Sequence, residues 1–242
     1  MMGKGVAVVA GVGEGLGSAV ARRFAAAGYN AVMWARSEDK VQGYAEQIRA
    51  QGGQAAGMKV DVRVEQEVTD AFVRIEREHG PIEVAVFNAG AQHRKPLLEI
   101  SADQFEKVWR LGCLGGFVFG REAIRHMLPR KRGTLLFTGA TSALRGGAHF
   151  AAFAATKFGL RAVAQSMARE FGPQGIHVAT VIVDGAIDMP AIHARFGDRI
   201  KDLPPDGLLN PDAIAETYFQ LHQQQRSAWS LEVDVRPYCE KF

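Results

Sequence analysis

Short apolar segments alternate with longer segments of helical spacing from one end of the chain to the other, and this alternation restricts the fold more than any other feature. The apolar segments are continuous runs, which is typical of strands covered on both faces. Six such runs lie at residues 6–10, 30–35, 55–60, 83–88, 134–139 and 177–183. We therefore expect a sheet that is buried between layers of helices.

The segments between these runs carry apolar residues at helical spacing. The clearest of them lie at residues 17–27, 40–50, 65–79 and 101–128. Strand and helix repeated in this order imply right-handed crossovers, so the predicted fold class is α/β: a single Rossmann-type domain over residues 1–242 with a doubly wound parallel sheet. The proline-containing stretch 188–210 is expected to be irregular. It follows the sixth strand, where ligands of such sheets bind, and is the expected substrate lid.

The composition is that of a globular protein and lacks the charge of a nucleic-acid binder. Of the 242 residues, 47% are hydrophobic and 23% are charged, and the formal net charge is only +3. The basic cluster Arg130, Lys131 and Arg132 lies between a proline and a glycine and is interpreted as a solvated turn. No apolar run reaches the roughly 20 residues that span a bilayer. These features argue against nucleic-acid and membrane partners.

Cysteine and histidine, which often build special sites, show no such pattern here. Cys113 and Cys239 form neither a disulfide framework nor a metal-binding spacing, so we expect a reducing, cytoplasmic location. His93 and His193 lack further ligands of suitable spacing. The sequence therefore predicts no metal site.

A glycine-rich turn follows the first apolar run. In AGVGEGLGSAV, Gly11, Gly13, Gly15 and Gly17 lie around Leu16 and open the first helical segment. Glycine lets the backbone approach a pyrophosphate, and the start of the helix offers free N–H groups and the positive end of its dipole. The pattern alone also fits a flexible loop, but its place between a strand and a helix favours dinucleotide binding.

The residues after the second apolar run indicate which cofactor the chain binds. An NAD site usually has an acidic residue there, whereas Ala35 followed by Arg36 suits a 2′-phosphate, although Arg36 also fits an ordinary surface arginine. We therefore favour NADP(H) over NAD(H), with Ser37 as an extra donor and Glu14 as a mild counterargument near the phosphates. Asp61, after the third run, is either at the adenine edge or the cap of the following helix.

Three motifs, GVGEGLG at 11–17, NAG at 88–90 and FAATK at 153–157, together resemble the short-chain dehydrogenase/reductase family, and the resemblance extends to the strand-like segment 230–235. It implies a nicotinamide cofactor, a small-molecule substrate and a homodimer or homotetramer packed through two long helices, here 101–128 and roughly 150–171. The further cofactor contacts that it implies are Val62, Asn88, Ala89, Gly90, Lys157, Gly185 and Ile187.

Three of the four catalytic positions of the family pattern carry side chains unsuited to its usual chemistry. Lys157 falls on the family lysine that binds the nicotinamide ribose. Phe153 stands where the family has a tyrosine and can neither donate nor accept a proton. Ala140 stands at the position of the serine that polarises the substrate carbonyl, and Gly112 at that of the asparagine.

A replacement proton source is therefore needed for carbonyl reduction, because a placed general acid contributes about 10²–10⁴-fold. The candidates are His149, one turn before the phenylalanine if the helix has begun, and the hydroxyls of Thr141 and Ser142. Asp184 offers another route, because an anion beside the nicotinamide would suit an iminium substrate that needs no proton after hydride transfer. Each also has a structural interpretation: a loop histidine, a turn residue, or a carboxylate paired with Lys157 or a backbone amide.

Two functions are compatible with these residues. The first is an NADP(H)-dependent oxidoreductase with a non-standard active site and a small C=O or C=N substrate. The mouth of that site would hold His93, Arg94, His193 and Arg195. The second is a catalytically silent NADP(H)-binding protein, either a redox sensor or an oligomer scaffold. The fold alone cannot choose between them, because one fold carries many functions.

Overall fold

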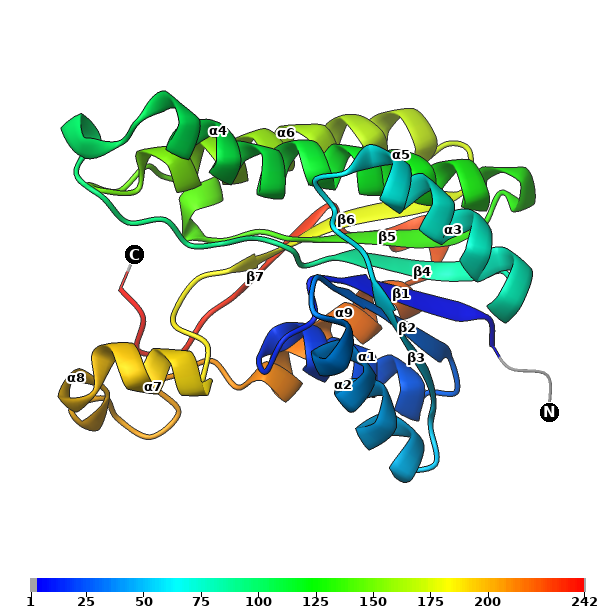
Figure 1. Cartoon of the computed structure of the whole chain (residues 1–242), viewed down its shortest axis with the longest axis horizontal. Helices are drawn as coiled ribbons and strands as arrows, with labels where there is room; N and C mark the ends of the chain where they lie inside the picture. The colour runs from blue at the N-terminus through cyan, green and yellow to red at the C-terminus, as the bar shows by residue number, and fades with distance from the viewer. Residues whose placement is uncertain (1–3, 242) are drawn as a thin grey trace.

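The computed structural model describes residues 4–241, apart from the side chains of residues 198 and 199, and this part of the chain forms a seven-stranded sheet (Figure 1). The strands are β1 (Val6–Ala10), β2 (Asn30–Ala35), β3 (Gln54–Lys59), β4 (Ile82–Phe87), β5 (Gly133–Thr138), β6 (Ile176–Val183) and β7 (Glu232–Val235). Their order is β3-β2-β1-β4-β5-β6-β7, and every neighbouring pair is parallel. The order changes direction between β1 and β4, which is where ligands bind in open α/β sheets.

Helices cover both faces of this sheet (Figure 1). They are α1 (Leu16–Ala26), α2 (Glu38–Ala50), α3 (Glu65–His79), α4 (Ala102–Trp109), α5 (Gly115–Met127), α6 (Ala151–Phe171), α7 (Pro190–Phe196), α8 (Asp198–Lys201) and α9 (Pro211–Gln223). Figure 1 shows α3, α4, α5 and α6 on one face and α1, α2 and α9 on the other. The predicted doubly wound α/β fold is confirmed.

The two faces of each central strand explain its unbroken apolar run. Along β1, Val6 and Val8 join the core beneath α3, α5 and α6, while Ala7 and Val9 join the core beneath α1 and α9. Every residue of β1 is fully buried, so alternate positions face two different cores and none faces water. Continuous hydrophobicity is therefore what the parallel sheet requires.

Two predicted segments differ from the structure. The helix expected over 101–128 is divided into α4 and α5 by a π-helical turn at Arg110–Leu114. This turn packs closely on α6: a Cβ at Gly112 would lie 2.4 Å from Thr156 Cγ2. The stretch 188–210, expected to be irregular, contains the short helices α7 and α8. None of the helices formed by the described residues is long and apolar enough to cross a membrane.

Candidate active site

A cleft of about 510 Å³ lies at the carboxyl ends of β1, β2, β3 and β4. The residues expected to bind cofactor that line it are Gly11, Gly13, Gly15, Leu16, Gly17, Arg36, Asp61, Val62, Asn88, Ala89, Gly90 and Ile187. Ser37 does not line this cleft and instead precedes α2, where its side chain makes no capping hydrogen bond. Gly185 lines the neighbouring cavity. The structure thus brings nearly all of these residues together around one elongated space.

The glycines of the turn have different tasks. Gly11 has a φ of +86°, and a Cβ there would lie 2.4 Å from Ala89 N. A Cβ at Gly17 would lie 2.6 Å from the carbonyl oxygen of Gly11, so both positions are closed to larger residues. A Cβ at Gly13 would have no neighbouring atom within 4 Å, so a ligand has room to approach the backbone there. This cradle fits the pyrophosphate of a dinucleotide.

Asp61 lies at the far end of the cleft and had two interpretations, a contact to the adenine edge or the cap of the following helix. Its carboxylate accepts hydrogen bonds from Arg63 Nε at 2.9 and 3.1 Å, and these bonds hold the pKa of Asp61 below its ordinary value. The residue that caps α3 is Val64, so Asp61 is not the helix cap. Arg36 lines the cleft, is exposed, and has no ion pair with any described residue. Its guanidinium is therefore available to a phosphate, while exposed Glu14 also lines the cleft.

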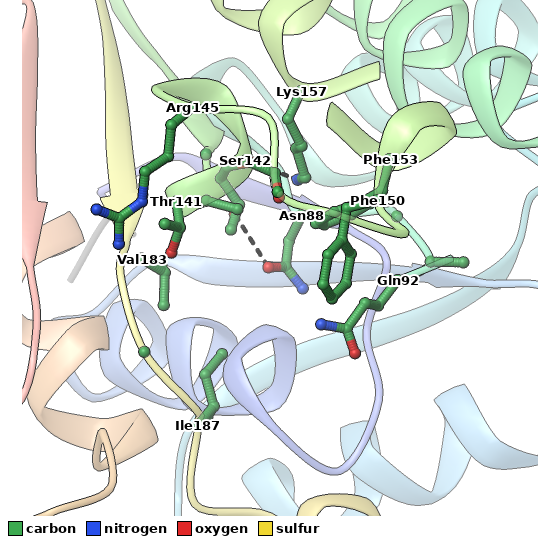
Figure 2. A pocket seen from close by; sticks show the side chains of 17 residues that line it. Asn88, Gln92, Thr141, Ser142, Arg145, Phe150, Phe153, Lys157, Val183 and Ile187 are labelled. Atoms are coloured by element: carbon green, nitrogen blue, oxygen red, sulfur yellow. Dashed lines mark hydrogen bonds between the residues drawn. The ribbon is translucent and has the colours of Figure 1, made fainter. Parts of the chain in front are cut away.

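A second cavity of about 450 Å³ continues from the cleft and shares Asn88, Gly90 and Ile187 with it. Its walls come from the residues after β4 and β5, from the start of α6 and from the segment after β6. Figure 2 shows Thr141 and Arg145 on one side of this cavity and Phe150 with Gln92 on the other. A small molecule in this cavity would therefore lie next to one end of a ligand in the cleft.

Lys157 is the buried cation of this cavity. It is 6% exposed, and its Nζ donates a hydrogen bond to the backbone oxygen of Thr138 at 2.7 Å. Burial lowers the pKa of Lys157 to about 8. The Phe153 ring centre lies 5.8 Å from Nζ, and among the described residues no carboxylate pairs with the ammonium. Two of its three N–H donors remain for ligands.

A hydrogen-bond network behind Lys157 joins the carboxyl ends of β1, β4 and β5 to α9. Thr138 Oγ1 donates to Asn88 Oδ1 at 3.0 Å and lies 2.7 Å from the hydroxyl of Tyr218, which is buried on α9. Asn88 Nδ2 in turn donates to the backbone oxygen of Gly11 at 2.9 Å. The network orients the Asn88 amide between both cavities. Sequence reasoning missed Thr138 and Tyr218, because their spacing along the chain contains no local signal.

Asp184 does not present a free anion to the cavity. Its buried carboxylate accepts a hydrogen bond from the Thr141 hydroxyl and lies 3.7 Å from the guanidinium of Arg236. The residues on either side of Asp184 line the cavity, whereas Asp184 itself does not. The expected pairing with Lys157 is also absent. The iminium hypothesis loses its physical basis, because the negative charge is already compensated.

The candidate proton donors fare differently. His149 has a φ of 69°, is exposed, and precedes α6, which begins only at Ala151. It is not among the residues that line the cavity, and the structure does not bring it together with Lys157. Phe150 occupies the wall instead. Ser142 and Thr141 do line the cavity, but the Thr141 hydroxyl is held by the carboxylate behind it.

The three unusual positions are now placed in space. Phe153 and Ala140 line the cavity, so an apolar ring and a methyl group form the wall next to Lys157. Gly112 is buried in the π-helical turn, where a side chain would collide with Thr156. The Thr156 side chain therefore excludes an amide at position 112 unless this side chain or α6 moves.

The expected mouth residues His93, Arg94, His193 and Arg195 do not line the 450 Å³ cavity. His193 Nε2 lies 2.5 Å from Asp188 Oδ1, so these two side chains satisfy each other. Arg195 and Arg94 line an adjoining cavity of about 390 Å³. His93 is half-buried. Among the described residues, no group of three or more His, Cys, Asp or Glu side chains could hold a metal ion.

Comparisons with known proteins agree on one family. The sequence pattern described as short chain dehydrogenase matches residues 5–196, which include every residue that lines the two cavities. The chain is 33% identical, over 174 residues, to the 2-dehydro-3-deoxy-D-gluconate 5-dehydrogenase of Formosa agariphila. That match covers 72% of this chain and 66% of the relative.

Solved structures give the same result. The crystal structure of a short-chain dehydrogenase from Rhodopseudomonas palustris is 43% identical, with a TM-score of 0.83 over 97% of this chain and 98% of that one. A metagenomic short-chain oxidoreductase in complex with NADP is 25% identical, with a TM-score of 0.81 over 96% of each chain.

Proposed function

The chain belongs to the short-chain dehydrogenase family, and from this premise we propose that it is an NADP(H)-dependent oxidoreductase in which Lys157 replaces the family tyrosine as proton donor. The observation that carries the proposal is the buried Lys157 ammonium, which faces a cavity continuous with a dinucleotide-shaped cleft. The reaction is hydride transfer to or from a small carbonyl compound. A C=O substrate is favoured over C=N, because Asp184 is compensated by Arg236 and Thr141.

The cofactor would lie along the cleft, with its pyrophosphate over Gly13 and the start of α1 and its 2′-phosphate at Arg36. Asn88 and Gly90, which line both cavities, would contact its nicotinamide end. When bound, the cofactor supplies or accepts a hydride at nicotinamide C4. The NADP bound to the metagenomic relative supports the choice of NADP(H).

The protein's own part in the reaction is proton transfer and orientation. Lys157 keeps one N–H on Thr138 and would direct another towards the alkoxide that forms on carbonyl reduction. A pKa of about 8 suits an acid that works near neutral pH, because the lysine holds its proton there and releases it at small cost. The Ser142 hydroxyl would hydrogen-bond to the same oxygen, while Phe153 and Ala140 exclude water beside it.

The test is NADPH oxidation with a panel of aldehydes and ketones, measured for the wild type and Phe153→Tyr. We expect the wild type to reduce at least one compound, and the variant to reduce carbonyls faster, because a phenol is restored beside Lys157. If both proteins bind NADPH but none of the carbonyl compounds causes its oxidation, the proposal is contradicted. That result would favour the second function, a silent NADP(H)-binding protein, which the non-polar residues at positions 140 and 153 also permit.

We also propose a homo-oligomer that packs through α4, α5 and α6. Large apolar side chains on these helices are partly exposed, among them Phe105 and Trp109 on α4, Phe117 on α5 and Phe158 on α6. Burying them against a second copy would remove apolar surface from water. Light scattering coupled to size exclusion distinguishes a dimer or tetramer from the monomer that would refute this.

A further inference from the structure

The charged residues that line the proposed catalytic cavity are all basic. Arg145 and Lys157 line it, and none of its lining residues is an aspartate or glutamate. The adjoining cavity of about 390 Å³ shares Gln92 and Phe150 with it, adds Arg94 and Arg195, and likewise has no acidic residue in its lining. Four cations therefore line the two adjoining cavities.

These cations are not neutralised by nearby acids. The two closest carboxylates in sequence to the cavity wall are engaged elsewhere: Asp184 with Arg236 and Thr141, and Asp188 with His193. Among the described residues, the guanidinium of Arg145 has neither an ion pair nor a hydrogen-bond acceptor. By contrast, Arg161, on α6, is ion-paired with Glu232 at 2.6 Å.

The wall opposite Arg145 combines aromatic surface with the amide of Gln92. Figure 2 shows the Phe150 ring across the cavity from Arg145, and Phe153 also lines this space. A ligand between these groups would meet an aromatic surface on one side and a planar guanidinium on the other. A guanidinium binds a carboxylate through two parallel hydrogen bonds, which fixes the orientation of the ligand as well as its charge.

We propose that the substrate is a carbonyl compound with an aromatic or apolar body and a carboxylate, and that Arg145 binds the carboxylate. The assignment of the carbonyl rests on the proposed function, whereas the assignment of the carboxylate rests on the charges and walls of the cavity. Arg94 and Arg195 draw the anion towards the entrance. Arg145 is thus a specificity-determining residue.

The experiment measures binding of three unreactive probes of nearly equal size by isothermal titration calorimetry: phenylacetate, phenylacetamide and 2-phenylethylammonium. Titrations are made without cofactor and with NADP⁺ at saturation, so that no turnover is needed. We expect phenylacetate to bind at least about tenfold more tightly than the amide, and the ammonium most weakly. Arg145→Gln should remove the preference, Arg145→Lys should keep part of it, and Arg74→Gln on α3, far from the cavity, should leave it unchanged.

Equal affinities for phenylacetate and phenylacetamide, or a preference that survives in Arg145→Gln, would overturn the inference. The outcome is separable from that of the proposed function. If Arg145→Gln loses the carboxylate preference but no carbonyl compound causes NADPH oxidation, the anion site is supported and the proposed reductase function is refuted. If neutral carbonyl compounds are reduced but no carboxylate preference is found, the reductase function is supported and the anion site is refuted.

Discussion

Replacing Lys157 with methionine should change stability in a way that depends on pH. Lys157 is 6% exposed, and its pKa in the folded protein is about 8, against an ordinary value of 10.5. At about 1.4 kcal/mol for each factor of ten in proton affinity, the burial of the charged form costs about 3 kcal/mol below pH 8. Methionine has a similar length and no charge, so Lys157→Met removes this cost.

The sign of the effect follows from where the proton is bound. Between pH 8 and 10.5 the unfolded chain holds a proton on Lys157 that the folded chain has released, so wild-type stability rises with pH relative to the variant. The variant also loses the hydrogen bond to Thr138, and an unpaired carbonyl costs about 1–3 kcal/mol. We therefore expect the variant to be nearly as stable as the wild type, or more stable, at pH 7.

The assay is urea unfolding of the cofactor-free proteins at pH 7 and at several values up to 10.5. The free energy of unfolding of Lys157→Met minus that of the wild type should decrease by about 3 kcal/mol over this range. Lys40→Met, at an exposed position on α2, should show no such change. A difference that stays constant with pH would refute the burial of a charged lysine at this site.

Three further predictions concern the cofactor turn, the cofactor charge and the half-buried His222 on α9. Gly17→Ala should lower the free energy of unfolding by about 1–3 kcal/mol in chemical unfolding, because its Cβ would lie 2.6 Å from the Gly11 carbonyl oxygen. Gly13→Ala should leave the free energy of unfolding unchanged and weaken only cofactor binding. Arg36→Ala should weaken NADPH binding about tenfold or more and leave NADH binding unchanged in fluorescence titrations; equal losses for both would contradict a 2′-phosphate site. Burial lowers the pKa of His222 to about 4, so as the pH falls from 6.5 to 4 the unfolded chain takes up a proton that the folded chain does not, and the free energy of unfolding decreases. His222→Gln should lose less stability than the wild type over this interval in urea unfolding. An identical loss in both proteins would contradict the expectation.

The fold was predictable because its signals are local and repeated. A strand such as β1 is apolar at every position, since Val8 and Val9 face different cores, and this pattern is visible in the sequence alone. The division of the helix at 101–128 was not visible, because the π-helical turn depends on how closely Gly112 packs against Thr156 of α6. Helical spacing in the sequence indicates which face of a helix is apolar, but it does not indicate a close contact between two helices.

The gathering of the candidate cofactor residues around one cleft was predictable for a related reason. These residues follow the ends of successive strands, and parallel strands bring those ends to one edge of the sheet. The surroundings of single side chains were not. Asp184 lies against Arg236, and Thr138 contacts Tyr218, and each of these partners is distant in sequence. The left-handed backbone of His149 turns that residue out of the cavity, and its sequence neighbours give no sign of it.

The central claim is that the site transfers hydride to a carbonyl group without a tyrosine. The most direct measurement uses NADPH deuterated at nicotinamide C4, each stereoisomer in turn, with a panel of aldehydes, ketones and cyclic imines analysed by mass spectrometry. We predict that one stereoisomer alone places a single deuterium on the carbinol carbon of an alcohol, and that Lys157→Met abolishes the label. Label found only in amines, or no label in any product although NADPH binds, would contradict the claim.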